Sequence, residues 1–450
     1  MWLKKWYGRW GPRDRQADSS MLRAARALLR NYWRYDAFRP GQEPVVTASS
    51  SGRDVLALLA TGTGKSVCYQ IPGLIRGGTT LVVSPLTALI EDQVAGLVGR
   101  SIPAIGFVGR VAPVMYASVL RMARRGESFF LFVAPERLAS RAFLRLMERL
   151  DVRLMVADEA HCVSEWGLSF RPAYRQVGAF RRDHVPGVPL MALTATATPR
   201  VQRDIVRSLG LRNPVLVEGT ANRPNLVYSV FHEPEPLAQL QRVLDAVPGS
   251  AIVYDSTRRG VERWAERLAL AGYDVAAYHG GMRPGERERS QRAWMRRDAR
   301  IMVATNAFGM GIDKPDVRAV VHVGMPESLA AYYQEAGRGG RDGRPAHAVL
   351  IRTDEAEKDR RRLAGNDRRA RRAMKTVFRY SRTTTCRREW LVRHFGDTKR
   401  ITCGMCDNCT GRHEPYVPAK DRVAGKQNAA GKQEPAWKRE QRTLWELERP

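Results

Sequence analysis

Short apolar runs rich in β-branched residues alternate with longer amphipathic stretches along most of this chain. This alternation is typical of parallel strands joined by crossover helices. It predicts a first α/β lobe with five strands, at Asp54–Leu59, Thr80–Ser84, Phe129–Ala134, Arg153–Ala157 and Leu190–Leu193. A second lobe of similar build is predicted with strands at Ala251–Tyr254, Val275–Tyr278, Arg300–Ala304, Ala319–Val323 and Ala348–Ile351.

Turn-forming residues separate these two series of strands. Residues 219–225 read GTANRPN, and Gly, Pro and Asn all favour turns. We therefore expect a hinge within residues 215–235. The stretch from Gly411 and the first twenty residues are polar without a sustained apolar period, which predicts mobile ends. Four aromatic residues near the start are candidates for docking on the protein or stacking on bases: Trp2, Trp6, Tyr7 and Trp10.

Length and composition limit the class of protein. At 450 residues the chain is long enough for two or three domains, and an apolar content of 44% supports large buried cores and excludes disorder of the whole chain. No apolar stretch is long enough to span a bilayer, and the basic start lacks the apolar centre of a signal peptide. We therefore expect a cytosolic protein without a membrane anchor.

Charge points to a polyanionic partner. Lys and Arg number 75 against 46 Asp and Glu, which gives a net charge of +29. That is more than solubility requires, and nucleic acid or an anionic membrane surface would match it. Within residues 358–372, eight of fifteen residues are Lys or Arg. This run predicts either a solvated helix face or a surface that contacts phosphates.

A candidate phosphate-binding loop follows the first predicted strand. Residues 60–66 read ATGTGKS, and the next segment is a predicted helix, so the context is right for such a loop. The backbone of Thr61, Gly62, Thr63 and Gly64 would direct N–H groups at phosphate oxygens. Lys65 would contact the β and γ phosphates and Ser66 would hold Mg²⁺. The strict pattern asks for Gly at position 59, where this chain has Leu59.

Two adjacent carboxylates end a later apolar strand, in the segment Leu154–His161 with sequence LMVADEAH. A metal-bound nucleotide needs such groups at the carboxyl end of a strand. Asp158 is suited to Mg²⁺ and Glu159 to accepting a proton from the attacking water. His161, taken alone, is equally compatible with a structural histidine.

Arginines and cysteines mark two further sites. Arg338 and Arg341 lie in the glycine-rich segment Gln334–Gly343 and are candidates to stabilise the charge that develops in phosphoryl transfer, although surface arginines are usually only solvated. Tetrahedral Zn²⁺ with four thiolates requires short spacers and one distant ligand. Four cysteines fit that spacing, and free thiols are the alternative: Cys386, Cys403, Cys406 and Cys409. We expect Cys68 and Cys162 to be buried thiols.

In this order, the blocks closely resemble the RecQ family of superfamily two DNA helicases over residues 25–410. Further blocks carry the resemblance: Phe38–Gln42, Leu81–Leu86, Asp92–Gln93, Ala134–Leu138, Leu193–Thr198, Val303–Asp313 and Tyr332–Gly343. The resemblance implies that Arg39 and Gln42 read adenine while Tyr35 stacks on it. It also implies that Arg341 is an arginine finger with Arg338 beside it, and that the four cysteines bind zinc.

The segment Cys162–Pro172 is similar to the aromatic-rich loop through which this family senses single-stranded DNA. The resemblance carries that role to Trp166, Phe170 and Arg171. Stacking of bases on aromatic rings contributes about 1–3 kcal/mol per base and tolerates any sequence. Packed core aromatics are the alternative. The loop has Leu168 and Ser169 where the family usually has His and Asp.

The resemblance implies an α/β fold of two tandem RecA-like parallel-sheet lobes followed by a small helical zinc-binding subdomain. We place the divisions as an N-terminal extension 1–24, lobe one 25–215, lobe two 216–355, the zinc subdomain 356–412 and a polar tail 413–450. Longer RecQ proteins continue into a winged-helix domain, for which we expect the remaining residues to be too few.

The implied function is an ATP-dependent 3′ to 5′ DNA helicase that uses ATP, Mg²⁺ and Zn²⁺ in DNA repair or recombination. Single-stranded DNA and tailed or branched duplexes are the expected partners, in the cytoplasm and, in a bacterium, on the nucleoid. Two alternatives remain. One is a DNA-stimulated translocase with little unwinding, and the other is a zinc-dependent DNA-binding protein whose motor has decayed.

Overall fold

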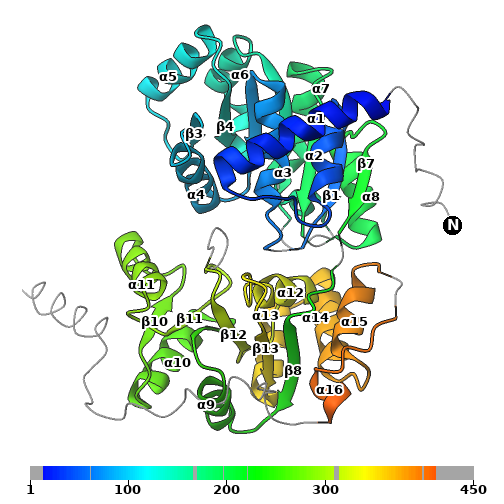
Figure 1. Ribbon diagram of the computed structural model, residues 1–450. Helices are drawn as coiled ribbons and strands as arrows, with labels where there is room; N and C mark the ends of the chain where they lie inside the picture. Colours follow the sequence, from blue (N-terminus) through cyan, green and yellow to red (C-terminus); the bar gives the residue numbers. More distant parts are fainter. Residues whose placement is uncertain are drawn as a thin grey trace, which may run out of the picture. The chain divides into compact units, whose positions relative to one another are not determined.

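The computed structural model describes residues 14–60, 62–165, 170–195, 197–219, 221–308, 314–397 and 400–411. The chain divides into two compact units, Met1–Ala221 and Asn222–Pro450, and each contains one parallel sheet (Figure 1). Several predicted features lie outside the described residues: Trp2, Trp6, Tyr7, Trp10, Thr61, Trp166, Leu168, Ser169 and the tail 413–450.

The first unit contains a seven-stranded parallel sheet of order β3-β4-β2-β5-β6-β1-β7. Its strands are β1 Val55–Leu58, β2 Thr79–Val83, β3 Ala104–Phe107, β4 Phe129–Val133, β5 Val152–Ala157, β6 Leu190–Thr194 and β7 Val215–Glu218. Its α-helices are α1 Asp14–Leu28, α2 Gln42–Ser50, α3 Lys65–Arg76, α4 Thr87–Val98, α5 Pro113–Arg124, α6 Arg141–Met147, α7 Gln176–His184 and α8 Pro199–Leu209.

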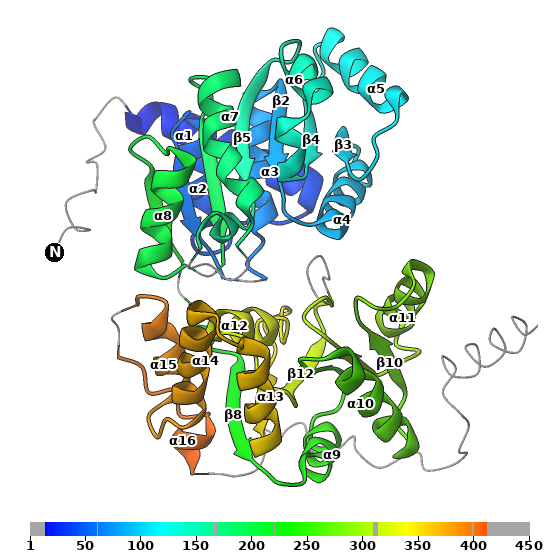
Figure 2. The ribbon, with the colours of Figure 1, turned by 180° about the vertical axis from the view of Figure 1, so that it is seen from behind.

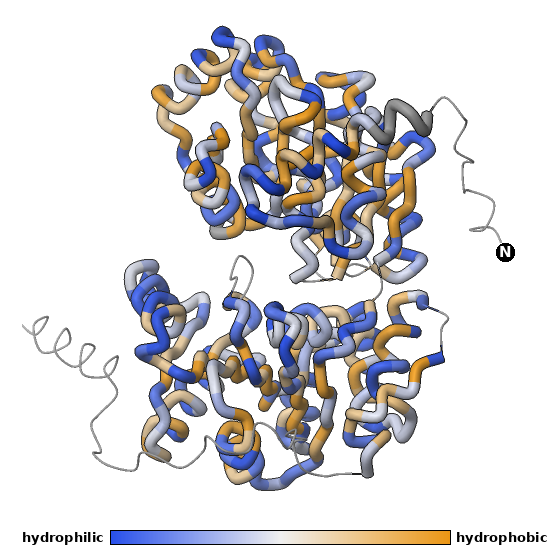
Figure 3. Tube along the Cα trace, viewed as in Figure 1, coloured by the Kyte–Doolittle hydropathy of each residue, from blue (hydrophilic) through white to orange (hydrophobic). Residues whose placement is uncertain are grey.

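Successive strand residues of this sheet face opposite layers. In β1, Val55 and Ala57 pack with α1 to α4, whereas Leu56 and Leu58 pack with α5 to α8. The period of two divides the buried side chains of the central strands between two cores, which is why these strands read as near-continuous apolar runs. Figures 1 and 2 show the two faces in turn, and Figure 3 shows that the strands carry the hydrophobic residues.

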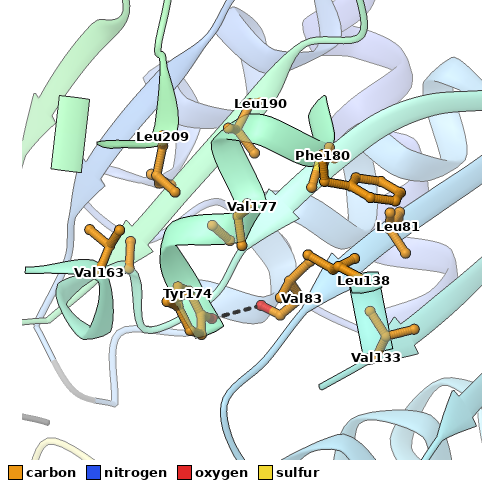
Figure 4. Close-up of a cluster of buried hydrophobic side chains, with 14 of the residues drawn as sticks. Leu81, Val83, Val133, Leu138, Val163, Tyr174, Val177, Phe180, Leu190 and Leu209 are labelled. Atoms are coloured by element: carbon orange, nitrogen blue, oxygen red, sulfur yellow. Dashed lines mark hydrogen bonds between the residues drawn. The ribbon is translucent and has the colours of Figure 1, made fainter. Parts of the chain in front are cut away.

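A buried tyrosine joins the second of these cores to the strand ends. Tyr174 is fully buried, and its hydroxyl donates to the Val83 carbonyl at 2.9 Å (Figure 4). The hydroxyl also lies at hydrogen-bond distance from the Asp158 carbonyl. One side chain in the core therefore joins the ends of β2 and β5, both of which bear sequence motifs.

The second unit contains a six-stranded parallel sheet of order β10-β11-β9-β12-β13-β8. Its strands are β8 Leu226–His232, β9 Ser250–Tyr254, β10 Val275–Tyr278, β11 Ile301–Ala304, β12 Val317–His322 and β13 Ala346–Arg352. Its helices are α9 Pro236–Ala246, α10 Arg258–Leu270, α11 Pro284–Arg296, α12 Leu329–Ala336, α13 Asp354–Ala364, α14 Arg368–Ser381, α15 Arg387–His394 and α16 Asp407–Thr410.

The helices after β13 do not form a separate core. Met374 and Phe378 of α14, together with Cys386 and Cys406, pack in the same cluster as Tyr228 of β8. α9 and α10 cover the opposite face of the sheet. The zinc-subdomain segment is therefore a layer on the second sheet, at its β8 edge.

The sequence predicts most of this architecture. All ten predicted strands are confirmed, with ends that differ by at most two residues. β3, β7 and β8 were not predicted. All three are edge strands, and β7 and β8 both lie within residues 215–235, the segment predicted to be a hinge. The two units divide between Ala221 and Asn222, inside this segment, and the described residues among 219–225 and 233–235 lie outside the strands, so the hinge stays a prediction.

Two boundaries also differ from prediction. β7 pairs with β1, so residues 216–218 belong to the first sheet and not to the second lobe. The helix α1 begins at Asp14, within the predicted N-terminal extension, and contacts α2 and α3. Short edge strands and a helix with few apolar residues leave a weak hydrophobic pattern, which explains both differences. Among the described helices, none combines the length and apolar character needed to cross a membrane.

A buried ion pair holds the first sheet to α7. Asp54 accepts two hydrogen bonds of 2.7 Å from Arg181, and both side chains are at most 4% exposed. Asp54 also accepts from the backbone N–H groups of Leu190 and Arg212. The carboxylate thus ties the start of β1 to β6 and to the segment that leads into β7.

We predict that Asp54→Ala lowers the free energy of unfolding by about 3–5 kcal/mol, because it leaves the Arg181 guanidinium buried without its partner. Urea denaturation would measure the change. Asp183→Ala is the matched control, since its pair with Arg182 is exposed; it should cost less than about 1 kcal/mol. Equal losses in the two variants would contradict the assignment.

Candidate nucleotide site and cysteine cluster

The segment between β1 and α3 forms a tight loop directed by glycine. Gly62 and Gly64 both have φ of +81°, and α3 begins at Lys65. A Cβ at position 64 would lie only 2.8 Å from Nε2 of Gln42, so glycine is required there for space as well as for backbone conformation. This strand, loop and helix arrangement matches the context that a phosphate-binding loop needs.

Leu59 occupies the position where the strict loop pattern has glycine. Its side chain is buried in the core between the sheet and α1 to α4. Its Cδ2 lies 3.0 Å from where a Cβ would stand on Gly41 and 3.1 Å from the same point on Gly219. These two glycines leave space for the Leu59 side chain. The core therefore accommodates leucine where the strict loop pattern has glycine.

The residues expected to read the base are bonded directly to the loop. The Gln42 Nε2 donates to the carbonyls of Thr63 at 2.8 Å and Gly64 at 3.0 Å. Arg39 donates from Nη1 to the Gly62 carbonyl and from its backbone N–H to the Gln42 side chain, both at 2.8 Å. Tyr35 is 48% exposed, with the Arg39 guanidinium 6.0 Å from its ring centroid. The Tyr35 ring is therefore available for stacking beside the loop.

The two carboxylates lie at the end of β5, against the loop lysine. The Lys65 Nζ is 3.9 Å from Oε1 of Glu159. Oδ1 of Asp158 accepts from the Glu159 backbone N–H at 2.9 Å, and both acidic residues are buried. Glu159 has φ of +47°, a left-handed conformation that is unusual for a residue with a side chain. Such strain clusters at functional sites.

Burial controls the electrostatics of this site. Burial and then the neighbouring Glu159 carboxylate raise the pKa of Asp158 to about 7, and Lys65 opposes the shift. Burial lowers the pKa of His161, but the adjacent Cys162 and Glu159 side chains outweigh it and raise the pKa to about 10. A divalent cation bound here would relieve the repulsion between the two acids.

His161 also connects two strand ends. Its Nδ1 lies 2.9 Å from Oγ1 of Thr194 at the end of β6 and 3.3 Å from Oε2 of Glu159. Thr194 belongs to the block Leu193–Thr198. The structural interpretation of His161 therefore fits, and the contact places this histidine between the carboxylates and a second sequence block.

The aromatic-rich segment begins in the core, with Cys162 and Val163, but Phe170 and Arg171 near its end are not packed there. Phe170 and Arg171 are half-buried, and the Arg175 guanidinium lies 4.9 Å from the Phe170 ring centroid. Arg175 donates to Glu165 at 2.7 Å, and the Arg171 N–H donates to the Cys162 carbonyl at 2.9 Å. The bond from Arg171 to Cys162 therefore holds the C-terminal end of this segment against the short helical turn that follows Asp158 and Glu159.

The arginine-bearing segment follows α12 in the second unit. Arg223 donates to the carbonyls of Gly337 at 3.1 Å and Gly339 at 2.9 Å, and Asn225 donates to that of Gly340 at 2.8 Å. Arg338 is 6% exposed and Arg341 is half-buried. The sequence indicates only turns at residues 219–225. It does not show that Arg223 and Asn225 hold this glycine-rich segment.

The four candidate zinc ligands come together. Their sulfur atoms all lie within 4.8 Å of one another, and the Cys403 and Cys409 sulfurs are 3.9 Å apart. Zn–S distances of about 2.3 Å in a tetrahedron imply sulfur atoms about 3.8 Å apart, so the cluster has the size of such a site. The hydrogen bond with Cys403 lowers the pKa of Cys406 to about 5. Cys68 and Cys162 are buried elsewhere, in the first unit.

A buried ion pair fixes this cluster to the second sheet. The Arg387 Nε donates to both carboxylate oxygens of Asp407, at 2.6 and 2.8 Å. Asp407 also accepts from the Val230 N–H on β8, and Arg388 donates to the carbonyls of Pro224 and Leu226. The unpaired edge of β8 is thereby covered by residues adjacent in sequence to the cysteines.

Comparison with known proteins agrees with this division of the chain. Residues 39–205 match the DEAD/DEAH box helicase family, residues 235–343 the helicase conserved C-terminal domain, and residues 349–410 the RecQ zinc-binding family. The three matches follow one another along the chain and leave residues 206–234 and 344–348 between them.

Curated relatives cover most of the chain. The ATP-dependent DNA helicase RecQ of Haemophilus influenzae is 38% identical over 405 residues, which are 87% of this chain and 64% of that protein. The ATP-dependent DNA helicase RecQ of Bacillus subtilis is 36% identical over 406 residues, which are 87% of this chain and 67% of that protein. The chain thus spans about two thirds of the length of these relatives.

Solved helicase structures share the fold. Mycobacterium smegmatis helicase Lhr bound to single-stranded DNA and AMP-PNP aligns with a TM-score of 0.59 at 25% identity, covering 72% of this chain and 47% of that one. Saccharomyces cerevisiae Dbp5 bound to RNA and ADP BeF3 aligns with a TM-score of 0.55 at 16% identity, covering 81% of this chain and 93% of that one. With these matches and the cysteine cluster in place, the chain belongs to the RecQ family of ATP-dependent DNA helicases.

Proposed function

We propose that this protein is a DNA helicase that couples ATP hydrolysis to 3′ to 5′ movement on single-stranded DNA and to duplex unwinding, in DNA repair or recombination. The observation that carries the proposal is the approach of Lys65 to Glu159, beside Asp158, at the carboxyl edge of the first sheet. A phosphate-binding cation and two acids gathered at one sheet edge form the chemical core of an NTP-hydrolysing site.

Each residue of this edge has a role in the proposed reaction. The loop N–H groups and Lys65 bind the β and γ phosphates, and Ser66 and Asp158 hold the cation that accompanies the nucleotide. Bound Mg²⁺ would neutralise charge that develops on the phosphate oxygens. Glu159 accepts the proton of the attacking water, and its left-handed backbone directs the carboxylate towards Lys65.

Arg341, with Arg338 beside it, supplies the positive charge that the transition state requires. Phosphoryl transfer spreads negative charge over equatorial oxygens, and an arginine finger contributes factors of about 10³ to 10⁵ in rate where it is measured. Because these arginines belong to the second unit, their engagement would couple nucleotide cleavage to movement of one unit relative to the other. This coupling is what a translocating motor needs.

Several features support DNA as the polymer. The net charge of +29 suits a polyanion, and Trp166, Phe170 and Arg171 combine stacking surfaces with a cation. The curated relatives are named DNA helicases, and the Lhr structure contains single-stranded DNA. Direction of movement and duplex unwinding come from the family alone.

The cysteine cluster is proposed to hold zinc. Its sulfur separations fit a tetrahedral ion, and the matched family is described as RecQ zinc-binding. Four thiolates close the coordination sphere, so the ion would have a structural role and no open position for substrate. Through Arg387 and Asp407 it would stabilise the layer that covers β8.

We predict that Lys65→Ala lowers the rate of DNA-stimulated ATP hydrolysis at least about 100-fold, because the phosphate contact and its charge are lost. A steady-state phosphate-release assay with and without single-stranded DNA would measure it. Lys375→Ala, at an exposed position on α14 outside the basic run 358–372, is the matched control and should retain the wild-type rate. Unchanged turnover in Lys65→Ala would show that the assigned site is wrong.

We predict one zinc per chain in the purified protein, and its loss in Cys403→Ala, since three thiolates hold the ion less tightly than four. Elemental analysis together with thermal unfolding would measure content and stability. Cys68→Ala removes a buried thiol from the first unit and should leave the zinc content unchanged. A zinc-free wild type, or equal zinc in both variants, would refute the assignment.

We predict that the protein displaces a strand from a duplex with a 3′ single-stranded tail and does so much more slowly with a 5′ tail. A gel or fluorescence displacement assay with ATP, and with a non-hydrolysable analogue as the blank, would measure both. ATP hydrolysis without displacement of either substrate would favour the translocase alternative.

A further inference from the structure

A buried cluster lies at the base of the arginine-bearing segment, within the second unit. It is formed by Tyr254 at the end of β9, His322 at the end of β12, Glu335 on α12 and Arg338 just after that helix. Tyr254, His322 and Arg338 are at most 6% exposed. Tyr254 and His322 lie outside the sequence blocks named above, and the proposed reaction assigns no role to these two residues or to Glu335.

Within this cluster, the histidine is bonded to the helix that carries the arginines. The His322 Nε2 lies 2.7 Å from Oε2 of Glu335, whose side chain is 12% exposed. Because a carboxylate only accepts hydrogen bonds, Nε2 is the donor. Glu335 precedes Arg338 by three residues, so this bond fixes the last turn of α12 immediately before the segment begins.

The tyrosine connects the histidine to two sequence blocks. Its ring stacks on His322 with centroids 5.2 Å apart and an interplanar angle of 25°. Its hydroxyl donates to the Phe308 carbonyl at 3.1 Å, in the block Val303–Asp313. Burial raises the pKa of Tyr254 to about 12, and the charge and hydrogen-bonding capacity of the nearby Arg338 guanidinium oppose that rise.

An unrestrained arginine side chain has high conformational entropy, and much of it is lost when the guanidinium is held in one position. A contact that fixes the side chain in advance removes this cost from the catalytic step. The Tyr254 hydroxyl bonds to the Phe308 carbonyl and is near the Arg338 guanidinium, so it can fix that guanidinium relative to the block Val303–Asp313.

We propose that Tyr254 and His322 are positioning residues that hold Arg338 ready for ATP cleavage. The inference rests on the proposed function, in which the segment bearing Arg338 and Arg341 acts on the nucleotide. Tyr254 acts on the guanidinium, and His322 acts through Glu335 and by stacking on Tyr254.

The Tyr254→Phe substitution tests the hydroxyl while it keeps the ring. In the full chain with single-stranded DNA, kcat for ATP should fall about tenfold, with the KM for ATP and the affinity for DNA within twofold of wild type. Tyr273→Phe is the matched control, because its hydroxyl donates to Asp245 at 2.7 Å in the same unit, away from the cluster. It should leave kcat unchanged.

His322 is tested with two variants, so that a folding defect is recognised. His322→Gln keeps an N–H donor for Glu335 and should retain kcat within about threefold, whereas His322→Leu loses the donor and should lose at least tenfold. Thermal unfolding of both separates a loss of stability from a loss of positioning. Equal kcat in the two variants at equal stability would overturn the role of the hydrogen bond.

A double-mutant cycle decides whether the tyrosine acts through the arginine. Arg338→Ala should itself lower kcat, and Tyr254→Phe should then cause no further loss in that background. A full additional tenfold loss would overturn the inference. If Arg338→Ala is impaired and Tyr254→Phe is not, the inference fails and the proposed function stands. If Arg338→Ala is fully active, the assigned role of Arg338 fails, and the positioning role with it.

Discussion

The contact between Lys65 and Glu159 depends on the parallel register of the first sheet. The two residues are 94 positions apart in the chain, yet β1 and β5 both run alongside β6 and end at the same edge. Parallel strands present all their carboxyl ends together, so a loop after one strand and acids after another must meet. Tyr174 supports this edge from the core side, where it joins the end of β2 to Asp158. The site is thus a consequence of the sheet.

The second unit also contains a parallel sheet, but different residues stand at the ends of its strands. At the ends of β9 and β12, Tyr254 stacks on His322, and His322 bonds to Glu335 in the segment that bears the arginines. Arg223 and Asn225 hold the carbonyls of that segment from the other side. The layer that contains the cysteine cluster packs on this sheet through Asp407 and Arg387. Residues next to the cysteines therefore join this layer to the same unit that contains Arg338 and Arg341.

The sequence predicts the features whose residues lie close together in the chain. Long buried strands read as apolar runs, and the loop around Lys65, the acids around Asp158 and the spacing of the cysteines are visible because each places its residues close together in the chain. Edge strands such as β3 and β7 are short and partly exposed, so their pattern is weak. The role of Arg223 depends on carbonyls more than 110 positions away, which only folding brings near. The sequence does not show that leucine fits at position 59, because Gly41 and Gly219, which leave space for its side chain, are distant from it in the chain.

In the proposed function, Arg341 of the second unit supplies positive charge to the reaction of a nucleotide bound by the first unit. Single-turnover ATP cleavage by Arg341→Ala, with single-stranded DNA bound and the affinity for an ATP analogue measured separately, tests this most directly. We predict analogue binding within a fewfold of wild type and cleavage slower by about 10³ or more. Wild-type cleavage by this variant would contradict the account.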